Sequence, residues 1–344
     1  MDKLIYLFSM SSLAIVFFFL NLKGAYTFIP FIYFFGLIPL MDYLLGESEY
    51  NFSSEEEEKV LNSNYYELVI ILSCLIHLAL VLVFLNMTSK ADSILTLVGL
   101  SCTLGFSCGL YGINLGHELG HRNSTWEKVL ANIMLFSSLY SQFFITHNKS
   151  HHKLIATPED ANTSKINQNV YHFWIRSIYL TTKKAFEFEV KRLKSKGLFA
   201  YGPRNLFILQ KLIEVSLLVA IYYFYGVQSL LAFMGAALFG ILLLETINYI
   251  EHYGLLRKRN ASGRYEKVQV WHSWNSNHVL GRALLFELSR HSDHHANASR
   301  RFQVLRHFDE SPQLPYGYPH MVVMSLFPKV FMKKMNPLVE RFQA

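Results

Sequence analysis

Residues 93–122 decide the fold, and they read SILTLVGLSCTLGFSCGLYGINLGHELGHR. No charged side chain occurs between residues 93 and 115. A helix rises about 1.5 Å per residue, so an apolar helix of roughly 20 residues crosses the hydrocarbon core of a membrane. This apolar stretch leads directly into His117 and His121, which lie one helical turn apart. The segment therefore predicts a membrane helix that ends in a pair of metal-ligating side chains.

Five further apolar blocks of about this length are separated by charged stretches. They are residues 4–22, 26–45, 66–87, 206–225 and 229–249. The chain has 344 residues, 51% of them hydrophobic, and buried helices of a soluble protein explain neither the number nor the length of these blocks. The first block is long for a signal peptide and no cleavage signature follows it, so we interpret it as a retained span. The sequence predicts an all-α integral membrane protein with six transmembrane helices.

The distribution of basic residues predicts the orientation of these spans. Of 32 Lys and Arg, 13 lie between His117 and Arg204 and 14 lie after His252. The connections expected on the opposite side carry only Lys23 and Lys90. An excess of basic residues marks the cytoplasmic side, so both termini and both long polar segments are expected there, beneath a bacterial inner membrane. The net charge of +7 is then a topology signal and requires no nucleic acid.

Four regions follow from this pattern. Residues 1–115 are expected to hold transmembrane helices 1–4, and residues 206–249 helices 5 and 6. Residues 116–205 and 250–344 are expected to form a cytoplasmic helical cap. The apolar stretch at 129–145 is just long enough to span, but spanning would separate two histidine motifs across the membrane. We therefore expect an interfacial or re-entrant helix there.

The chemistry is carried by histidines. Nine of the 15 fall into four motifs: HELGH from residue 117, HNKSHH from 147, NYIEHYG from 248 and HSDHH from 291. Helical positions three or four apart lie on one face about 5–6 Å apart, so each motif can point its imidazoles at one centre. Nine imidazoles indicate two ions, and imidazole suits zinc, copper, iron and nickel alike. The candidate ligands are His117, His121, His147, His151, His152, His252, His291, His294 and His295.

Three carboxylates stand beside these histidines. Glu118, Glu251 and Asp293 are candidates to accept the outer ring N–H of a ligand histidine, which fixes its orientation. For Asp293, a solvated carboxylate is an equally ordinary interpretation. Residues 117–121 also match H-E-x-x-H, in which two histidines bind zinc and the glutamate acts as the base of a metalloprotease. That alternative leaves seven clustered histidines without a role, and no Asp-Gly supplies its usual third-ligand motif.

The motifs together resemble the membrane-bound alkane 1-monooxygenases. The resemblance is carried by HELGHR at 117, HNKSHH at 147, NYIEHYGL at 248 and LSRHSDHH at 288, and extends through WNSNH at 274 and RHFDESPQLPYGYP at 306. It covers nearly all of the chain from about residue 39. Thr146 and Ser150 depart from the family, which usually has glutamate and glycine at these two positions.

The resemblance implies a non-haem di-iron centre held by the nine histidines. It implies that one oxygen atom of O2 enters the terminal C–H bond of medium or long-chain n-alkanes, giving 1-alkanols. Xylene monooxygenase and membrane fatty-acid desaturases are related, so alkylbenzenes and fatty acids are alternative substrates and desaturation is an alternative reaction. The three-residue gap between His147 and His151 favours hydroxylation, because the desaturases use H-x-x-H-H motifs at this place.

Two further expectations concern partners and substrate. The chain has no C-x-x-C pair and no G-x-G-x-x-G motif, so an external donor must supply electrons. The resemblance suggests rubredoxin, reduced by a flavin-dependent reductase, and basic residues of the cap are expected to attract it. These are Lys191, Arg192, Lys194, Lys196 and residues 257–259. Phe34 and Phe35 in the second span are candidates to line the substrate channel.

Overall fold

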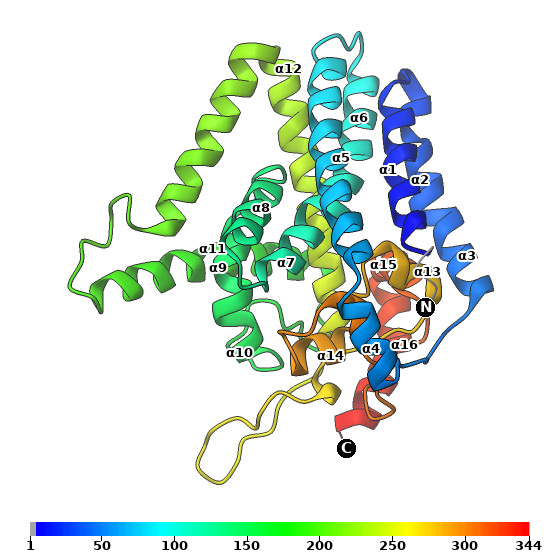
Figure 1. The fold of residues 1–344 in the computed structure, drawn as a ribbon, viewed down its shortest axis with the longest axis vertical. Coiled ribbons are helices and arrows are strands. Elements are labelled where there is room, and N and C mark those ends of the chain that lie inside the picture. The colour runs from blue at the N-terminus through cyan, green and yellow to red at the C-terminus, as the bar shows by residue number, and fades with distance from the viewer. Residues whose placement is uncertain (1–4, 344) are drawn as a thin grey trace.

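The structure is a computed structural model that describes residues 5–343, and within them it is all-helical without a strand. The apolar blocks form long helices that stand side by side in one half of the molecule (Figure 1). The first three blocks become α1 (Tyr6–Leu20), a run from Gly24 to Leu45, and α5 (Asn64–Thr88). Leu4, where the first block begins, lies outside the described residues. The fourth block becomes α6 (Ile94–Ser107), which continues through a π-helical stretch (Cys108–Ile113) into α7 (Asn114–Gly120).

The second block is broken into four short pieces. A 3-10 turn (Gly24–Phe28) leads into α2 (Ile29–Ile32), a π turn (Tyr33–Leu37) and α3 (Ile38–Leu45). Pro30 and Pro39 stand in the first turns of α2 and α3, where a missing backbone N–H costs least. The π turn between the two prolines holds Phe34 and Phe35. Such turns occur often at functional sites.

Four helical segments are long and apolar enough to cross a membrane: Gly24–Leu45, Asn64–Thr88, Ile94–Gly120 and Leu206–Glu251. Helix α1 has only 15 residues, which is shorter than a span requires. The two blocks expected at 206–225 and 229–249 form one element, α12 (Leu206–Glu251), of 46 residues. It kinks at Gly226, where φ is 82° and ψ is 175°, a backbone that glycine adopts readily. The two halves of α12 form the arms of an inverted V (Figure 1).

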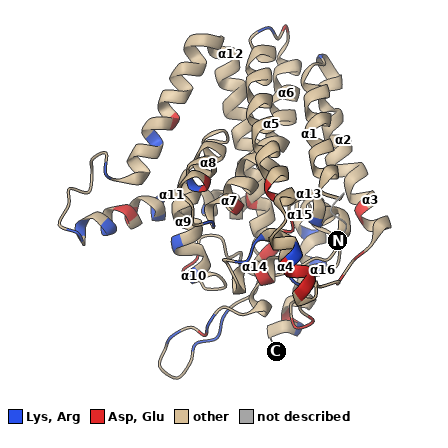
Figure 2. Cartoon of the chain, viewed as in Figure 1, with Lys and Arg blue, Asp and Glu red and all other residues tan. Residues whose placement is uncertain are grey.

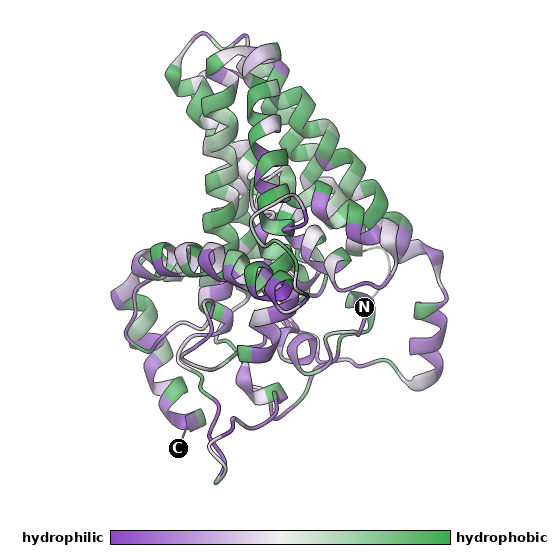
Figure 3. Ribbon diagram, turned by 90° about the vertical axis from the view of Figure 1, so that its left-hand side faces the viewer, coloured by the Kyte–Doolittle hydropathy of each residue, from purple (hydrophilic) through white to green (hydrophobic). Residues whose placement is uncertain are grey.

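Apolar and charged side chains separate into two halves of the molecule. The long helices are hydrophobic along most of their length, and the hydrophilic segments gather below them (Figure 3). Lys, Arg, Asp and Glu show the same division (Figure 2). Large apolar side chains of the upper half lie on the surface, and Ile94 and Tyr223 are each 79% exposed. Extended apolar surface of this kind is matched to lipid rather than to water. The chain is therefore a multi-pass membrane protein.

The polar half is built from helices that are mostly short, apart from α11 with 25 residues. They are α4 (Ser54–Leu61), α8 (Thr125–Phe136), α9 (Gln142–Thr146), α10 (His152–Leu154), α11 (Val170–Lys194), α13 (Val279–Leu284), α14 (His291–Ala296), α15 (Tyr318–Ser325) and α16 (Pro328–Gln343). The stretch at 129–145 is divided between α8 and α9, with Leu139 at a φ of 52° between them. Helix α8 has 12 residues, about 18 Å, which is too short to cross a membrane.

A buried ion cluster fixes the chain just before the last histidine motif. Arg282 Nε lies 2.7 Å from Glu287 Oε2, and the hydroxyl of Tyr6 donates to Glu287 Oε1 at 2.7 Å. Arg290 donates to the carbonyl of Leu305 at 2.6 Å. Burial works against ionisation of Glu287, but the guanidinium groups of Arg282 and Arg290 hold its pKa below the usual range. The negative charge of Glu287 is thus compensated by the two guanidinium groups, as a buried carboxylate requires. These contacts hold the chain in place just before α14.

Candidate metal centre

Four elements bring the histidine motifs to one place. His117 lies on α7 and His121 follows it, so the helical segment Ile94–Gly120 carries the first motif. The second motif occupies a π turn (His147–His151) between α9 and α10. This turn is wider than an α-helical turn, and it directs His147, His151 and His152 towards the region where the other motifs meet. His252 caps the end of α12, and His291, His294 and His295 lie on α14.

All nine candidate histidines converge, in two adjacent groups. The five-histidine group contains His117, His121, His147, His152 and His294, and the four-histidine group contains His151, His252, His291 and His295. Within each group the ligand nitrogens lie within 4.8 Å of one another. The rings of His147 and His151 have centroids 5.2 Å apart although they belong to different groups. The structure thus forms two neighbouring nitrogen cages.

The spacing of the nitrogens fits a metal ion in each cage. Nε2 of His117 lies 3.0 Å from Nε2 of His294 and 3.1 Å from Nε2 of His121. In the other group, Nε2 of His291 lies 2.9 Å from that of His295 and 3.2 Å from that of His252. An imidazole nitrogen binds a first-row metal at about 2.1 Å, so two ligands at right angles are about 3.0 Å apart. The observed spacing is that of a coordination sphere.

The protonation of the imidazoles also suits metal binding. Burial lowers the pKa of His147, His291 and His294 well below the usual range, and neighbouring imidazoles act in the same direction. These rings are therefore neutral at physiological pH, which is the form that binds a metal. Several outward ring nitrogens have no hydrogen-bond partner among the described residues. They are Nδ1 of His147, His152, His252, His291 and His295.

His151 is held by a carboxylate that the sequence did not identify. Its Nδ1 lies 2.9 Å from Asp160 Oδ2, and Thr163 Oγ1 donates to the same oxygen at 2.8 Å. Burial alone raises the pKa of Asp160, but His151 and His252 outweigh it and lower the pKa to about 2. Nε2 of His151 is left facing the four-histidine group. Asp160 follows His151 by nine residues, and no helical spacing relates the two, so only the folded chain brings them together.

The three carboxylates named from the sequence have different surroundings. Glu251 Oε2 lies 3.2 Å from Nε2 of His291, which is the nitrogen that faces the group, and Glu251 Oε1 has no partner among the described residues. Glu251 therefore stands on the inner side of the imidazoles. Glu118 lies 3.3 Å from Arg122, and Asp293 lies 2.8 Å from Arg300. These last two carboxylates have basic partners, and no hydrogen bond to a histidine ring is found for them in residues 5–343.

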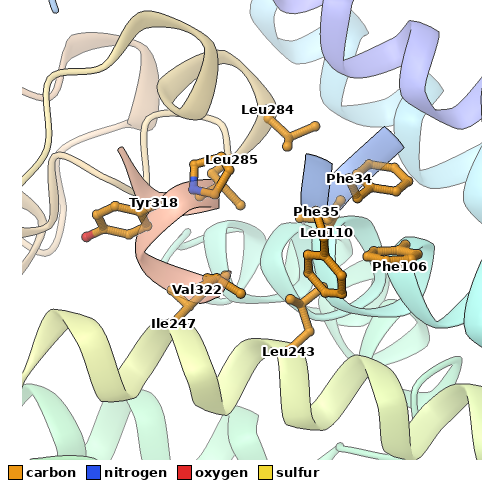
Figure 4. A pocket seen from close by; sticks show the side chains of 11 residues that line it. Phe34, Phe35, Phe106, Leu110, Leu243, Ile247, Leu284, Leu285, Tyr318 and Val322 are labelled. Carbon is orange, nitrogen blue, oxygen red and sulfur yellow. The ribbon is translucent and has the colours of Figure 1, made fainter. Parts of the chain in front are cut away.

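An apolar cavity lies where the long helices meet α13 and α15 (Figure 4). It has a volume of about 40 Å³ and is lined by Phe34, Phe35, Phe106, Leu110, Leu243, Ile247, Leu284, Leu285, Tyr318, Pro319 and Val322. Leu110 precedes His117 by seven residues, about 10 Å along the chain's helix, and Ile247 precedes His252 by five. Phe34 stacks on Phe106 with centroids 4.4 Å apart. The π turn of the second span thus places both candidate channel residues in the cavity wall.

Known proteins are similar to this chain over most of its length. An alkane 1-monooxygenase of Alcanivorax borkumensis is 38% identical over 318 residues, which cover 90% of this chain and 81% of the relative. One of Pseudomonas aeruginosa is 38% identical over 320 residues, covering 90% and 82%. The chain belongs to the alkane 1-monooxygenase family. Membership makes it an oxidoreductase of the monooxygenase type and sets aside the zinc protease interpretation.

Alkane 1-monooxygenases lie within a wider group of histidine-motif proteins. The family model for fatty acid desaturases matches residues 92–324, which contain all four histidine motifs. The hydroxylase component of a xylene/toluene monooxygenase from Pseudomonas putida is 26% identical over 231 residues, covering 64% of this chain and 58% of the relative. This chain is thus more similar to the alkane enzymes than to the xylene enzyme.

Proposed function

We propose that this chain hydroxylates the terminal carbon of medium or long-chain n-alkanes at a centre of two non-haem iron ions. The observation that carries the proposal is the pair of imidazole groups, together with an apolar cavity whose wall includes residues of the helices that lead into His117 and His252, in a chain of this family. Two bound irons would supply the activation of O2, of which one oxygen atom enters the C–H bond. The five-histidine group would hold one iron and the four-histidine group the other. Asp160 would orient His151, and Glu251 stands close enough to join the second ion's surroundings.

The contribution of the apolar residues is orientation. A terminal methyl C–H bond is stronger than the methylene bonds beside it, so attack at the terminus requires the substrate to arrive end-on. A cavity of about 40 Å³, measured as the space open to the centres of water-sized spheres, is about three times what one water molecule needs on that measure. It would receive the end of an alkyl chain. The remainder of the alkane would extend between the membrane helices, having entered from the bilayer in which it dissolves.

Phe34→Ala is expected to shift activity towards longer alkanes. Phe34 is 4% exposed and packs against Phe106 in the cavity wall, so its removal lengthens the cavity. The measurement is the relative rate of 1-alkanol formation across a series of n-alkanes. Phe18→Ala is the matched control, because Phe18 is 60% exposed on the outer face of α1 and should leave the profile unchanged. An unaltered profile in Phe34→Ala would remove this ring from the substrate path.

The membrane arrangement we propose has six spans in the inner membrane, with the polar half in the cytoplasm. Each arm of α12 is about twenty residues long, so the kink at Gly226 allows this helix to cross twice. Helix α1 would need the residues next to it to complete a crossing. The polar half contains the histidine motifs and nearly all basic residues of the chain, in keeping with the positive-inside rule.

Rubredoxin is the donor we propose, reduced in turn by a flavin-dependent reductase. The basic residues named from the sequence lie in two places. Lys191, Arg192 and Lys194 end α11, and Arg192 pairs with Glu189 at 2.6 Å. Residues 257–259 lie near the start of the long loop that follows α12, at the polar end of the molecule (Figure 1).

The loop is linked to the metal centre by a hydrogen bond. It leads through His272 to Ser273, whose carbonyl accepts a hydrogen bond of 2.9 Å from Ser292. Ser292 is next to His291 in the four-histidine group. We therefore favour the loop as the place where the donor docks. An acidic donor would be attracted to its basic side chains, as charge steering requires.

Product analysis tests the reaction type and the substrate class together. Cells that express the chain would be supplied separately with n-alkanes, alkylbenzenes and fatty acids, and the products identified by mass spectrometry. We expect 1-alkanols from the n-alkanes at the highest rate. Unsaturated products alone would identify a desaturase, and benzylic alcohols without 1-alkanols would identify an alkylbenzene hydroxylase.

A further inference from the structure

Glu245 is a buried carboxylate near the C-terminal end of α12 that the proposed chemistry does not use. It is 0% exposed and precedes His252 by seven residues on the same helix. Its Oε1 accepts a hydrogen bond of 2.6 Å from the hydroxyl of Tyr140. Its Oε2 accepts one of 2.6 Å from Ser177 and one of 3.3 Å from Nδ2 of Asn162. Burying such a group is costly unless it is fully hydrogen-bonded, and here three separate segments supply the donors.

The first connection leads from Glu245 to the five-histidine group. Tyr140 stacks on Phe143, with ring centroids 5.8 Å apart and planes at 25°. Phe143 stacks in turn on His147, with centroids 4.7 Å apart and again at 25°. Nδ1 of His147 has no hydrogen-bond partner among the described residues, so this stack is a main determinant of the ring's orientation.

The second connection leads to the four-histidine group. Asn162 lies two residues after Asp160 in a buried polar loop, and both side chains are less than 5% exposed. Asp160 holds Nδ1 of His151 at 2.9 Å. The hydrogen bond from Asn162 to Glu245 therefore fixes the loop that orients His151.

These two connections meet on one carboxylate. Tyr140 precedes the π turn of His147–His151 and Asn162 follows it, so Glu245 holds both flanks of this turn against the helix that ends in His252. A π turn is less favourable than an α-helical turn and persists only where its surroundings hold it. We propose that Glu245 is a positioning residue that fixes the spacing of the two metal sites, through one histidine of each. This inference rests on the proposed two-metal centre.

The two connections predict separable effects on the two metal sites. Tyr140→Phe removes the connection to His147, and Asn162→Ala removes the connection to the loop of His151. Each variant is expected to accelerate metal release from one site about tenfold, because partners that orient ligands typically change metal affinity 10- to 100-fold. Glu245→Ala should affect both sites. Glu245→Gln keeps an acceptor oxygen for Tyr140 and should spare the five-histidine site.

The test is the rate of iron release to a chelator from the purified, iron-loaded chain, together with its ⁵⁷Fe Mössbauer spectrum. Sites with five and four imidazoles should give two distinct signals, and each connection should alter one of them. Glu189→Gln is the control, because Glu189 is equally buried but pairs with Arg192 on α11, away from the histidines. Equal effects of all variants on both signals, or no difference from Glu189→Gln, would overturn the inference. A wild-type chain without two irons would instead contradict the proposed function.

Discussion

His294→Ala is expected to lose metal and to lower alkane hydroxylation by at least about 100-fold, more than removal of a residue that only orients a ligand. Nε2 of His294 lies 3.0 Å from that of His117, within the five-histidine group. Alanine removes one ligand and leaves an apolar gap that no neighbouring side chain fills. The measurements are iron per chain by elemental analysis and the rate of 1-alkanol formation.

His172→Ala is the matched control for this substitution. His172 is exposed on α11 and belongs to neither group, so both iron content and rate should remain at the wild-type values. His121→Ala, in the same group as His294, should behave like His294→Ala. Full activity in a zinc-loaded, iron-free protein would contradict the requirement for iron at these histidines.

Omission of the electron donor is expected to abolish turnover. Insertion of one oxygen atom, with the other released as water, consumes two electrons. The sequence carries no motif for a flavin, a haem or an iron–sulfur cluster. Purified chain with a nicotinamide alone should therefore give no 1-alkanol, and addition of rubredoxin with its reductase should restore the reaction.

Salt should weaken the interaction with rubredoxin, because charges further apart than about 8–10 Å are screened at physiological ionic strength. The apparent affinity for rubredoxin would be measured over a range of salt concentrations, with the alkane at saturation. Arg257 and Arg259 would then be replaced together by glutamine, and this variant should show a weaker salt dependence. An affinity independent of salt would contradict the basic docking surface alone, whereas turnover without any donor would contradict the requirement for one.

The sequence predicted the fold and the metal site best where a pattern involves residues that are neighbours in the chain. Uninterrupted apolar residues predicted the long helices, and helical spacing together with clustering in four short motifs pointed to the nine histidines that the structure brings together. Local patterns do not reveal how tertiary contacts divide these histidines. His147 and His152 join one group while His151, between them in sequence, joins the other, because the π turn aims neighbouring rings at different cages.

Other features depend on contacts between distant segments. Hydropathy predicts where an apolar helix lies, including the two helices that meet at the non-helical Gly226 of α12, but not that Tyr33–Leu37 forms a π turn. Asp160 and Glu245 are not at a helical spacing from the histidines that they orient. Their roles follow from hydrogen bonds that form only when the loop at 155–164 packs against α11 and α12. A charged residue within an apolar helix, such as Glu245, is nevertheless a sequence signal for a buried polar network.

The most direct measurement is isotopic analysis of the product from the reconstituted enzyme. Purified, iron-loaded chain would be supplied with rubredoxin, its reductase, a medium-chain n-alkane and ¹⁸O₂, and the product examined by mass spectrometry. We expect the 1-alkanol, with one ¹⁸O atom in each molecule, from protein that contains about two irons per chain. An alkene, an alcohol whose oxygen comes from water, or the same product from protein without iron would contradict a di-iron hydroxylase.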